Sequence, residues 1–365
     1  MKYSVEVVTD EPAFAELGPQ WGRLYRGCAA ATPFQSHAWL HSWWLSYGRP
    51  GRLRLLLVRD GRDLVAVAPL MRVRRPVPAL VPLGGAISDY GDVLVDDERG
   101  EEAVGALTEA LWSAARTALI DLREVRPGAA AEQVYARWGG PRRRVDDSLC
   151  LELPAVPMDE LVARLPSAKA QRVRAKLRKL AALGVERHVV PPGEVDKALR
   201  RLVELHRLQW QGRKVTGEHL RPRFREHLVR SVGAMVESGD AVVTEFRLED
   251  DVVAVDLTLL SGRLAGGYLY GAHPCLRERK ADVAVMLLDA CAEQACDGGR
   301  DTLSLLRGDE PYKRHWRPEQ VGNQRLLLAR RRTAPLLSAA LCDVAARRRG
   351  KDVVRRWRER GGDGP

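Results

Sequence analysis

The stretch AVVTEFRLEDDVVAVDLTLLSGRLAGGYLY, residues 241–270, decides the fold of this chain. Its apolar and β-branched residues form three runs, separated by polar turns, at 241–248, 252–260 and 264–270. Runs of this length between such turns predict a three-stranded antiparallel meander. The residues that follow, 282–296, have the composition of a helix and end before Gly298-Gly299, a pair that favours helix termination.

The first half of the chain shows a similar succession. A hairpin is predicted over residues 53–73, with Asp60-Gly61 at its turn, and a helix over 101–118. The repetition predicts the fold class α/β, of the α+β kind, with two similar units in tandem and a cleft between them. The expected boundaries are an N-terminal unit at 1–153, a basic linker helix region at 154–190, a C-terminal unit at 191–330 and an arginine-rich helical tail at 331–365.

Composition excludes several classes of protein. With 365 residues, 45% of them hydrophobic, the chain can bury a full core. No apolar run approaches the ~20 residues of a membrane-spanning helix, and the first residues have the pattern of a strand rather than of a signal peptide. The six cysteines are scattered without a CxxC pair, so neither a metal site nor a disulfide framework is predicted. We therefore expect a cytoplasmic protein.

The positive charge is concentrated in two segments of the chain. The formal net charge is +11. Residues 164–187 contribute +7 and residues 330–360 contribute +8, which leaves the remainder at −4. Clustered charge of this kind favours a polyanionic partner.

Six motifs follow one another between residues 32 and 316. They are Pro33-Phe34-Gln35-Ser36-His37-Ala38-Trp39-Leu40, Val67-Ala68-Pro69-Leu70, Asp89-Tyr90-Gly91-Asp92, the basic segment that begins at Ser167-Ala168-Lys169, Leu205-His206-Arg207-Leu208-Gln209-Trp210, and Leu306-Arg307-Gly308-Asp309-Glu310-Pro311-Tyr312-Lys313-Arg314-His315-Trp316. Their order and spacing resemble the CelD-like, BioF-type branch of the GNAT acyltransferases. The double-GNAT layout of that branch is similar to that of the FemX/FemAB aminoacyl transferases.

This resemblance implies two GNAT-like domains around a cleft and an acyl transfer that forms an amide bond. It also implies that Tyr312 and Lys313 lie beside the ester of the acyl donor. Lys313 would stabilise the oxyanion of the tetrahedral intermediate or a phosphate of a terminal adenosine, and Tyr312 would donate a hydrogen bond or stack on a base. The alternative is a surface lysine beside a packed tyrosine. No Ser-His-Asp arrangement is evident, which favours direct transfer in a ternary complex.

The chain departs from the common GNAT pattern where a cofactor would be held. GNAT enzymes that use coenzyme A bind its diphosphate with a glycine-containing loop at a helix N-terminus. Here no glycine lies between Gly271 and Gly298, and Asp282 is placed to be the N-cap of the helix. No tightly bound cofactor is therefore predicted.

FemX-type transferases also lack that loop and take the acyl group from aminoacyl-tRNA. The resemblance therefore implies tRNA as a partner. Phosphates would be bound by the basic segment, through Lys169, Arg172, Arg174, Lys176, Arg178 and Lys179. The alternative for this segment is a solvated helix face, and the alternative donor is an acyl-CoA.

The acceptor, a small-molecule amine, has to be neutral to react, so a general base is expected nearby. Asp89 and Asp92, in a glycine-containing loop, are two candidates, with turn formation and capping as the alternative role. Asp256, in the middle of a strand, would bind an amino group or be a paired structural acid. Further substrate-binding candidates are His206 and Trp210, one helical turn apart, with packing in the core as the alternative, and Tyr268 and Tyr270, on one strand face.

Together these observations predict an amide-forming acyltransferase with an aminoacyl-tRNA donor. Two alternatives stay open. One is an acyl-CoA-dependent N-acetyltransferase, and the other is a non-catalytic RNA-binding module.

Overall fold

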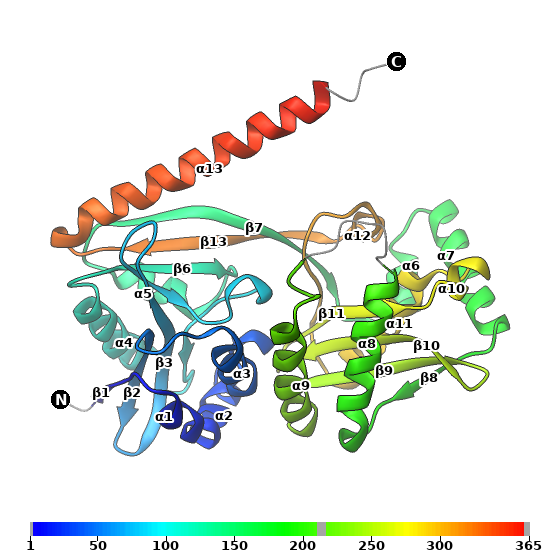
Figure 1. Cartoon of the computed structure of the whole chain (residues 1–365), viewed down its shortest axis with the longest axis horizontal. Coiled ribbons are helices and arrows are strands. Elements are labelled where there is room, and N and C mark those ends of the chain that lie inside the picture. The colour runs from blue at the N-terminus through cyan, green and yellow to red at the C-terminus, as the bar shows by residue number, and fades with distance from the viewer. Residues whose placement is uncertain (1–2, 210–216, 361–365) are drawn as a thin grey trace.

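The computed structural model of the chain describes residues 3–209 and 217–360. Figure 1 shows two halves side by side, which share one sheet of 13 described strands. Along this sheet the strands follow the order β1-β2-β3-β4-β6-β13-β7-β12-β11-β10-β9-β8, and β5 pairs with β3. The predicted mixed α/β class is confirmed.

The first half supplies the strands β1 (Tyr3–Val8), β2 (Leu53–Asp60), β3 (Asp63–Val73), β4 (Ala79–Pro82), β5 (Leu94–Val95), β6 (Leu119–Val125) and β7 (Arg142–Pro154). Its helices are α1 (Glu11–Glu16), α2 (Gly18–Arg26), α3 (His37–Tyr47), α4 (Gly100–Ala114) and α5 (Ala130–Arg137). Strands β2 and β3 form the predicted hairpin. Its turn contains Gly61 at a φ of +59°, a conformation that favours glycine.

The second half supplies the strands β8 (Val185–Val189), β9 (Ala241–Leu248), β10 (Asp251–Leu260), β11 (Leu264–Ala272), β12 (Thr302–Arg307) and β13 (Glu319–Leu328). Its helices are α6 (Met158–Ala163), α7 (Ser167–Ala182), α8 (Val195–Gln209), α9 (Pro222–Glu237), α10 (Cys275–Glu278), α11 (Val283–Asp297), α12 (Pro311–Arg314) and α13 (Ala334–Arg360). Strands β9, β10 and β11 form the predicted antiparallel meander.

Strand β13 joins the two halves. It lies between β6 and β7 and pairs antiparallel with both, although it follows the second half in sequence. Strand β7 in turn pairs with β12. The last strand of the second half is therefore built into the sheet beside the strands of the first, and one sheet runs through the molecule. The domain boundaries expected from the sequence stay a prediction.

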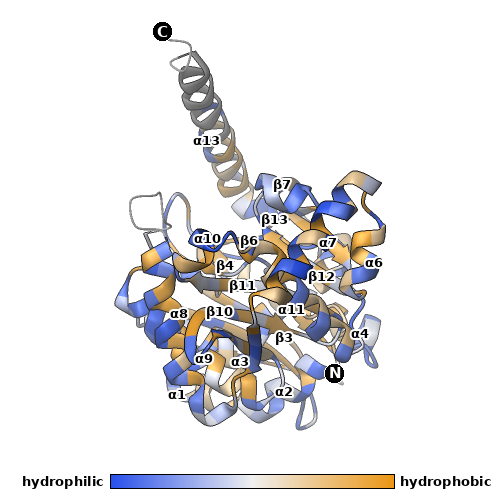
Figure 2. Ribbon diagram, turned by 90° about the vertical axis from the view of Figure 1, so that its right-hand side faces the viewer, coloured by the Kyte–Doolittle hydropathy of each residue, from blue (hydrophilic) through white to orange (hydrophobic). Residues whose placement is uncertain are grey.

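Helices cover both faces of the sheet. On one face, residues of α2, α3 and α8 share a single apolar core with strands of both halves, for example Trp21, Trp39 and Leu199 with Leu55 and Val255. On the opposite face, α4 and α5 pack on the first half, whereas α6, α7 and α11 pack on the second. Figure 2 shows the hydrophobic residues of the strands between these helices. Burial of this apolar surface is the main force that holds the layers together.

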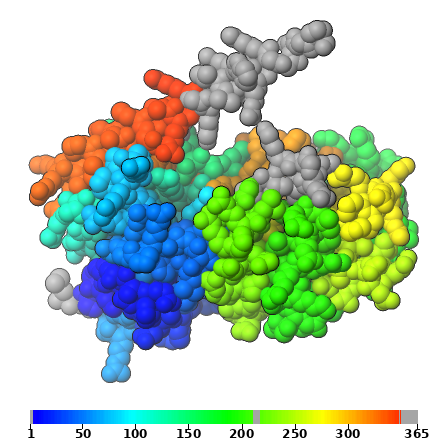
Figure 3. All heavy atoms as spheres, viewed as in Figure 1, coloured from blue at the N-terminus to red at the C-terminus, as the bar shows by residue number. Residues whose placement is uncertain are grey.

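Helices α3 and α9 hold the halves to one another on the shared face. The Ser42 hydroxyl of α3 donates a hydrogen bond of 3.0 Å to the main-chain oxygen of His227 in α9. The rings of Trp39 and His227 meet edge to face at 4.5 Å between centroids. In Figure 3 the atoms of the two halves are in continuous contact along their boundary.

Helix α13 is anchored on the first half by its initial turns. Leu337 and Ala340 are buried against residues of β4, β6 and β13, which include Ala79, Leu119 and Leu327. The apolar segment that begins the predicted arginine-rich tail therefore packs as a helix. Among the described residues, no helix combines the length and the apolar character needed to cross a membrane.

In each half, two neighbouring parallel strands separate after a short paired stretch. Strands β4 and β6 pair only at two positions, and β11 and β12 only at three. Near the end of one strand of each pair, Glu124 in β6 and Leu306 in β12 have positive φ angles of 55° and 57°. Such a conformation interrupts regular pairing. Each separation leaves a hollow, and these two hollows form the candidate site.

Candidate active site

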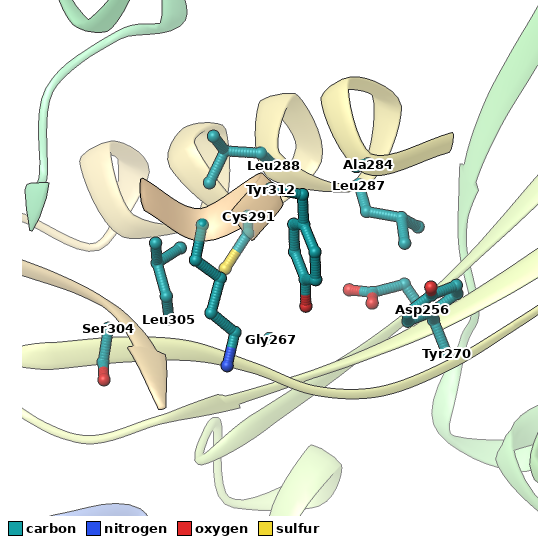
Figure 4. Close-up of a pocket in the computed structure, with 11 residues that line it drawn as sticks. Asp256, Gly267, Tyr270, Ala284, Leu287, Leu288, Cys291, Ser304, Leu305 and Tyr312 are labelled. Atoms are coloured by element: carbon teal, nitrogen blue, oxygen red, sulfur yellow. The ribbon is translucent and has the colours of Figure 1, made fainter. Parts of the chain in front are cut away.

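The first hollow, the β11–β12 pocket, has a cavity volume of about 130 Å³. Its walls come from the two separating strands, from β10, from helix α11 and from α12, which crosses the opening (Figure 4). The lining residues are Asp256, Gly267, Tyr270, Ala284, Leu287, Leu288, Cys291, Ser304, Leu305, Tyr312 and Lys313. Apolar atoms make up most of the lining surface, so the polar groups act in largely apolar surroundings.

Asp256 lies in the middle of β10, opposite Tyr270 of β11. It is only 4% exposed, and the Thr258 hydroxyl donates a hydrogen bond of 2.9 Å to its carboxylate. Burial raises the pKa of the carboxyl to about 7, and the hydrogen bond from Thr258 opposes this shift. A carboxyl with this pKa can accept and release a proton near neutral pH.

Lys313 is held inside the pocket by α12. The helix begins after Glu310, with Pro311 at its first position, which is favourable for helix initiation. The Lys313 ammonium donates a hydrogen bond of 2.7 Å to the main-chain oxygen of Arg307 and lies 2.9 Å from a carboxylate oxygen of Glu310. It is 7% exposed. These two contacts use two of the three ammonium hydrogens, so one remains for a ligand in the pocket.

Tyr312 covers the mouth of the pocket. Tyr312 as a whole is 52% exposed. Figure 4 shows its hydroxyl directed into the cavity, toward Asp256. Within the described part of the chain, no residue forms a hydrogen bond with this hydroxyl. Burial of the hydroxyl, together with the charge of Glu310, raises its pKa. The group therefore stays protonated and can donate a hydrogen bond at physiological pH.

Tyr268 and Tyr270 do not share a strand face, contrary to the sequence prediction. A register shift in the pairing of β10 with β11 leaves Tyr268 as an extra residue between two paired positions. Tyr270 lines the pocket on the α11 side. Tyr268 lies on the opposite side, where its hydroxyl donates a hydrogen bond of 2.8 Å to the main-chain oxygen of Ile87 in the first half.

His206 supports the pocket from behind. Its Nδ1 donates a hydrogen bond of 2.7 Å to the main-chain oxygen of Tyr270, and burial lowers its pKa. The imidazole is therefore neutral and does not line the cavity. The residue predicted as its companion, Trp210, lies outside the described residues.

The structure separates the two loop aspartates from the β11–β12 pocket. Asp92 is buried, and its carboxylate accepts hydrogen bonds from the main-chain N–H groups of Val93, Ala130 and Ala131, which fixes the start of α5. Burial raises its pKa to about 7. Asp89 forms an ion pair of 2.7 Å with Arg307. Neither side chain lines the pocket.

The second hollow, the β4–β6 pocket, occupies the equivalent place in the first half and has a cavity volume of about 380 Å³. Arg307 of β12 reaches into it from the second half and also pairs with Glu124, at 3.0 Å. Neither Arg307 nor Glu124 was predicted from the sequence as a site residue. Arg307 lies in a quoted motif, but its partners come from the other half of the chain, so no local signal connects them.

The two pockets share a wall. The hydroxyl of Tyr90, which lines the β4–β6 pocket, forms a hydrogen bond of 2.8 Å with the hydroxyl of Ser304, which lines the β11–β12 pocket. On the same wall, the ammonium of Lys313 contacts the main chain of Arg307. One layer of side chains therefore separates the two hollows.

Helix α7 presents the predicted basic residues mainly to solvent. Arg172, Arg174, Lys176, Arg178 and Lys179 are exposed and Lys169 is half-buried. His315 is the residue that follows α12. Its pKa is lowered mainly by burial and further by the positive charges of Lys169, Lys176 and Arg172. One row of α7 therefore faces the segment that carries Tyr312 and Lys313.

The start of α11 holds an acid instead of a glycine loop. The carboxylate of Asp282 accepts a hydrogen bond of 3.1 Å from the N–H of Val285, so the predicted N-cap is confirmed. The same carboxylate lies 2.6 Å from the ammonium of Lys176 in α7. A negative group thus already occupies the positive end of this helix.

Residues 167–314 match the family model described as an acetyltransferase (GNAT) domain. This range contains α7, the β9–β11 meander, α11, β12 and α12, and hence the residues that form the β11–β12 pocket. None of the curated proteins matches the chain.

Several solved structures share the fold at low sequence identity. The crystal structure of FemX has 12% identity and a TM-score of 0.61, with 92% of this chain and 99% of that chain covered. A conserved protein of unknown function from Bacteroides thetaiotaomicron VPI-5482 has 11% identity and a TM-score of 0.62, with 90% and 100% covered. L-PGS from Bacillus licheniformis has 14% identity and a TM-score of 0.56, with 89% and 95% covered. The similarity to these structures extends over both halves of the chain.

Proposed function

We propose that this chain, an acyltransferase with a GNAT domain over residues 167–314, forms an amide bond on a small-molecule amine and takes the acyl group from aminoacyl-tRNA. The observation that carries the choice of donor is the start of α11. A diphosphate bound there would lie against the Asp282 carboxylate, which already caps the helix and pairs with Lys176. The repulsion disfavours coenzyme A at this position.

Helix α7 supports the proposal from the other side. Its exposed basic residues offer several phosphate contacts beside α12. One of them, Lys176, already forms an ion pair with Asp282 at the start of α11. Among the described residues, no acid forms an ion pair with Arg174, Arg178 or Lys179. An acceptor stem laid along α7 would bring its aminoacylated end to Tyr312.

The polar groups of the β11–β12 pocket suit the proposed transfer. The amine of the acceptor attacks the carbonyl carbon of the ester, and the new C–N bond forms as the carbonyl oxygen becomes an oxyanion. Lys313 and the hydroxyl of Tyr312 stabilise this oxyanion. Asp256 takes the proton that the amine loses. The C–O bond to the ribose then breaks, and the leaving ribose oxygen receives the proton from Asp256.

The β4–β6 pocket is the proposed entrance for the acceptor. Its lining combines apolar side chains with charged groups such as Glu124, Asp147 and Arg307, and it shares a wall with the β11–β12 pocket. An amine on this side lies opposite to the basic face of α7, and it reaches the ester once Tyr90 and Ser304, which form the shared wall, move apart. Donor and acceptor would thus approach the reacting carbon from different sides, as direct transfer requires.

An acyl-CoA donor remains the second candidate, and one feature favours it. A hollow beside the start of α11 is lined by His273, Arg277 and Asp282. The guanidinium of Arg277 is a suitable partner for a diphosphate if the Asp282 carboxylate keeps its ion pair with Lys176 and turns away from the N–H of Val285.

The proposal is tested with labelled aminoacyl-tRNA and a panel of amines, by following the transfer of the label to the amine. Replacing Lys313 by Ala is expected to lower the rate ~10²–10³-fold, the usual effect of losing one oxyanion donor. Lys197→Ala, an exposed lysine of α8, is the matched control and keeps the rate. Binding of tRNA without transfer to any amine would favour a non-catalytic module, and equal rates in both variants would remove Lys313 from the reaction.

A further inference from the structure

A third hollow lies on the first half, away from both pockets. It has a cavity volume of about 620 Å³ and lies between the end of α4, the loop after α5 and the 3₁₀ turn η4 (Arg331–Thr333) that precedes α13. Its lining residues are Trp112, Arg116, Gly139, Arg330, Arg331 and Arg332. In Figure 1, α4 and the beginning of α13 lie in the first half, whereas α11 and α12 lie in the second. The hollow therefore belongs to neither proposed substrate site.

The arginines of this hollow come from two segments that Thr333 ties together. Thr333 is buried, and its hydroxyl donates a hydrogen bond of 3.1 Å to the main-chain oxygen of Ala115 at the end of α4. The same hydroxyl accepts a hydrogen bond of 2.9 Å from the N–H of Arg330. Arg116, the residue after Ala115, is thereby held beside the arginines of η4.

Trp112 orients one of these arginines. The guanidinium of Arg330 lies over its ring, 4.9 Å from the ring centroid. The ring of Trp138 meets Trp112 edge to face at 5.1 Å, and the indole N–H of Trp138 donates a hydrogen bond of 2.8 Å to the main-chain oxygen of Ala329. A guanidinium that stacks on an aromatic ring in this way can still donate hydrogen bonds to a ligand, because its N–H groups point outward in the guanidinium plane.

Within the lining of this hollow the positive charge is not compensated. Four of its six lining residues are arginines and none is acidic. Among the carboxylates whose side chains the structure describes, of which Asp343 is the last in the chain, none forms an ion pair with any of these four guanidiniums. Four like charges at one concave site repel one another, and an anion bound between them would relieve that repulsion.

We propose that this hollow binds a di- or triphosphate group. Guanidinium forks match phosphate oxygens in pairs, and several forks around one hollow match several phosphates in succession. A nucleic acid strand is a poorer fit, because it is held along a groove with exposed aromatic rings, and here the face of Trp112 is covered by Arg330. The group can come from an inorganic polyphosphate or from a nucleotide.

The test uses calorimetric titration of the full chain with inorganic tripolyphosphate and, separately, with ATP, at low ionic strength. We expect one bound equivalent and an affinity at least about tenfold lower in Arg331→Glu/Arg332→Glu, since a loss of about 1.4 kcal/mol is already a tenfold change. Arg23→Glu/Arg62→Glu is the matched control. Both residues are exposed and lie on other elements, and their replacement changes the net charge equally. A milder variant, Arg116→Gln, repeats the test should the double variant fail to fold.

Tighter binding of ATP than of tripolyphosphate would assign the site to a nucleotide, and the reverse would assign it to free polyphosphate. Both results support the proposal. Absence of saturable binding of both probes, or equal weakening in the two double variants, would overturn it. The proposal would also be overturned if the hollow bound tRNA instead and this binding were abolished in Arg331→Glu/Arg332→Glu. Acyl transfer is expected to be unchanged in Arg331→Glu/Arg332→Glu, so this result is independent of the proposed function.

Discussion

The Asp256 carboxyl is the group in the β11–β12 pocket whose protonation state changes near neutral pH. Its raised pKa, about 7, has a plain cause: the strand buries the group, and the Thr258 hydroxyl compensates only in part. A base has to be deprotonated to accept a proton from the amine. The rate of transfer is therefore expected to rise with pH and to level off above about 7.

The variant Asp256→Asn tests this role. We expect the rate to fall ~10²–10⁴-fold and the dependence on this pKa to disappear from the pH–rate profile. Asp92→Asn is the informative comparison, because the pKa of Asp92 is also about 7 while its carboxylate is bound to the start of α5. If the dependence of the rate on a pKa of about 7 disappears in Asp92→Asn and persists in Asp256→Asn, the base has been assigned to the wrong carboxyl.

Some site residues follow from the sequence and others do not. Asp256 was recognisable because a charged residue within an apolar strand is a local feature, whereas Tyr312 and Lys313 were expected from the family resemblance. All three line one pocket. The place of Tyr268 was not predictable, because a bulge in β11 leaves no mark in an alternating pattern. Arg307 was missed because its partners lie more than a hundred residues away.

Helices α3 and α9 form a contact between the halves that should respond to acid. His227 of α9 is 0% exposed, and burial lowers its pKa from 6.5 to about 3. As the pH falls below 6.5, the unfolded chain takes up a proton at this residue that the folded chain does not. The free energy of unfolding should therefore fall, by at most about 1.4 kcal/mol per pH unit from this group, until the pH approaches 3.

The measurement is chemical denaturation at a series of pH values between these limits. The free energy of unfolding should change less steeply with pH in His227→Gln than in the unmodified chain, since the titrating group is gone. His188→Gln, which replaces an exposed histidine of β8, should leave the slope unchanged. Equal slopes in all three proteins would show that His227 does not link stability to pH.

Helix α7 is the element on which the choice of partner depends. Reversing the charge at Arg172, Lys176 and Lys179 should weaken binding of total tRNA and make it less sensitive to salt. The slope of log K against log salt concentration should become shallower by about 0.7–0.9 for each phosphate that the helix no longer neutralises. Gel shift over a range of salt concentrations measures both effects. The same reversal at Arg23, Arg62 and Lys197, which are exposed on other elements, is the control. Unchanged binding in the α7 variant would move the tRNA site elsewhere.

The local pattern was sufficient for most elements but not for their assembly. The β9–β11 meander and the β2–β3 hairpin were predicted because their strands are neighbours in sequence. By contrast, the place of β13 between β6 and β7 depends on pairing with strands that lie more than 160 residues earlier in the chain. Such long-range pairing is decided by the packed sheet and not by the residues of the strand itself.

The two halves of the molecule depend on each other at Arg307. Its guanidinium joins β12 to Asp89 and Glu124 of the first half, and its main-chain oxygen receives the Lys313 ammonium. Arg307→Met leaves two carboxylates without their partner, which should lower the free energy of unfolding by roughly 1–3 kcal/mol and also lower the rate of transfer.

Chemical denaturation and the transfer assay measure the two effects of Arg307→Met. The matched control is Arg314→Met. The ion pair of Arg314 with Asp309 is about half exposed on both sides, so solvent screens it and its loss should destabilise the protein less than the loss of Arg307. If Arg307→Met is no more destabilising than Arg314→Met, the network between the halves does not contribute to stability as described.

The account depends above all on the identity of the acyl donor. The most direct measurement supplies one preparation with acetyl-CoA and with aminoacyl-tRNA in parallel, over the same set of amines. Released coenzyme A is followed with a thiol reagent, and amide formation is followed by the labelled amino acid. The account predicts label transfer from aminoacyl-tRNA and no amine-dependent release of thiol. Sustained turnover of acetyl-CoA would contradict it and place a diphosphate at the start of α11.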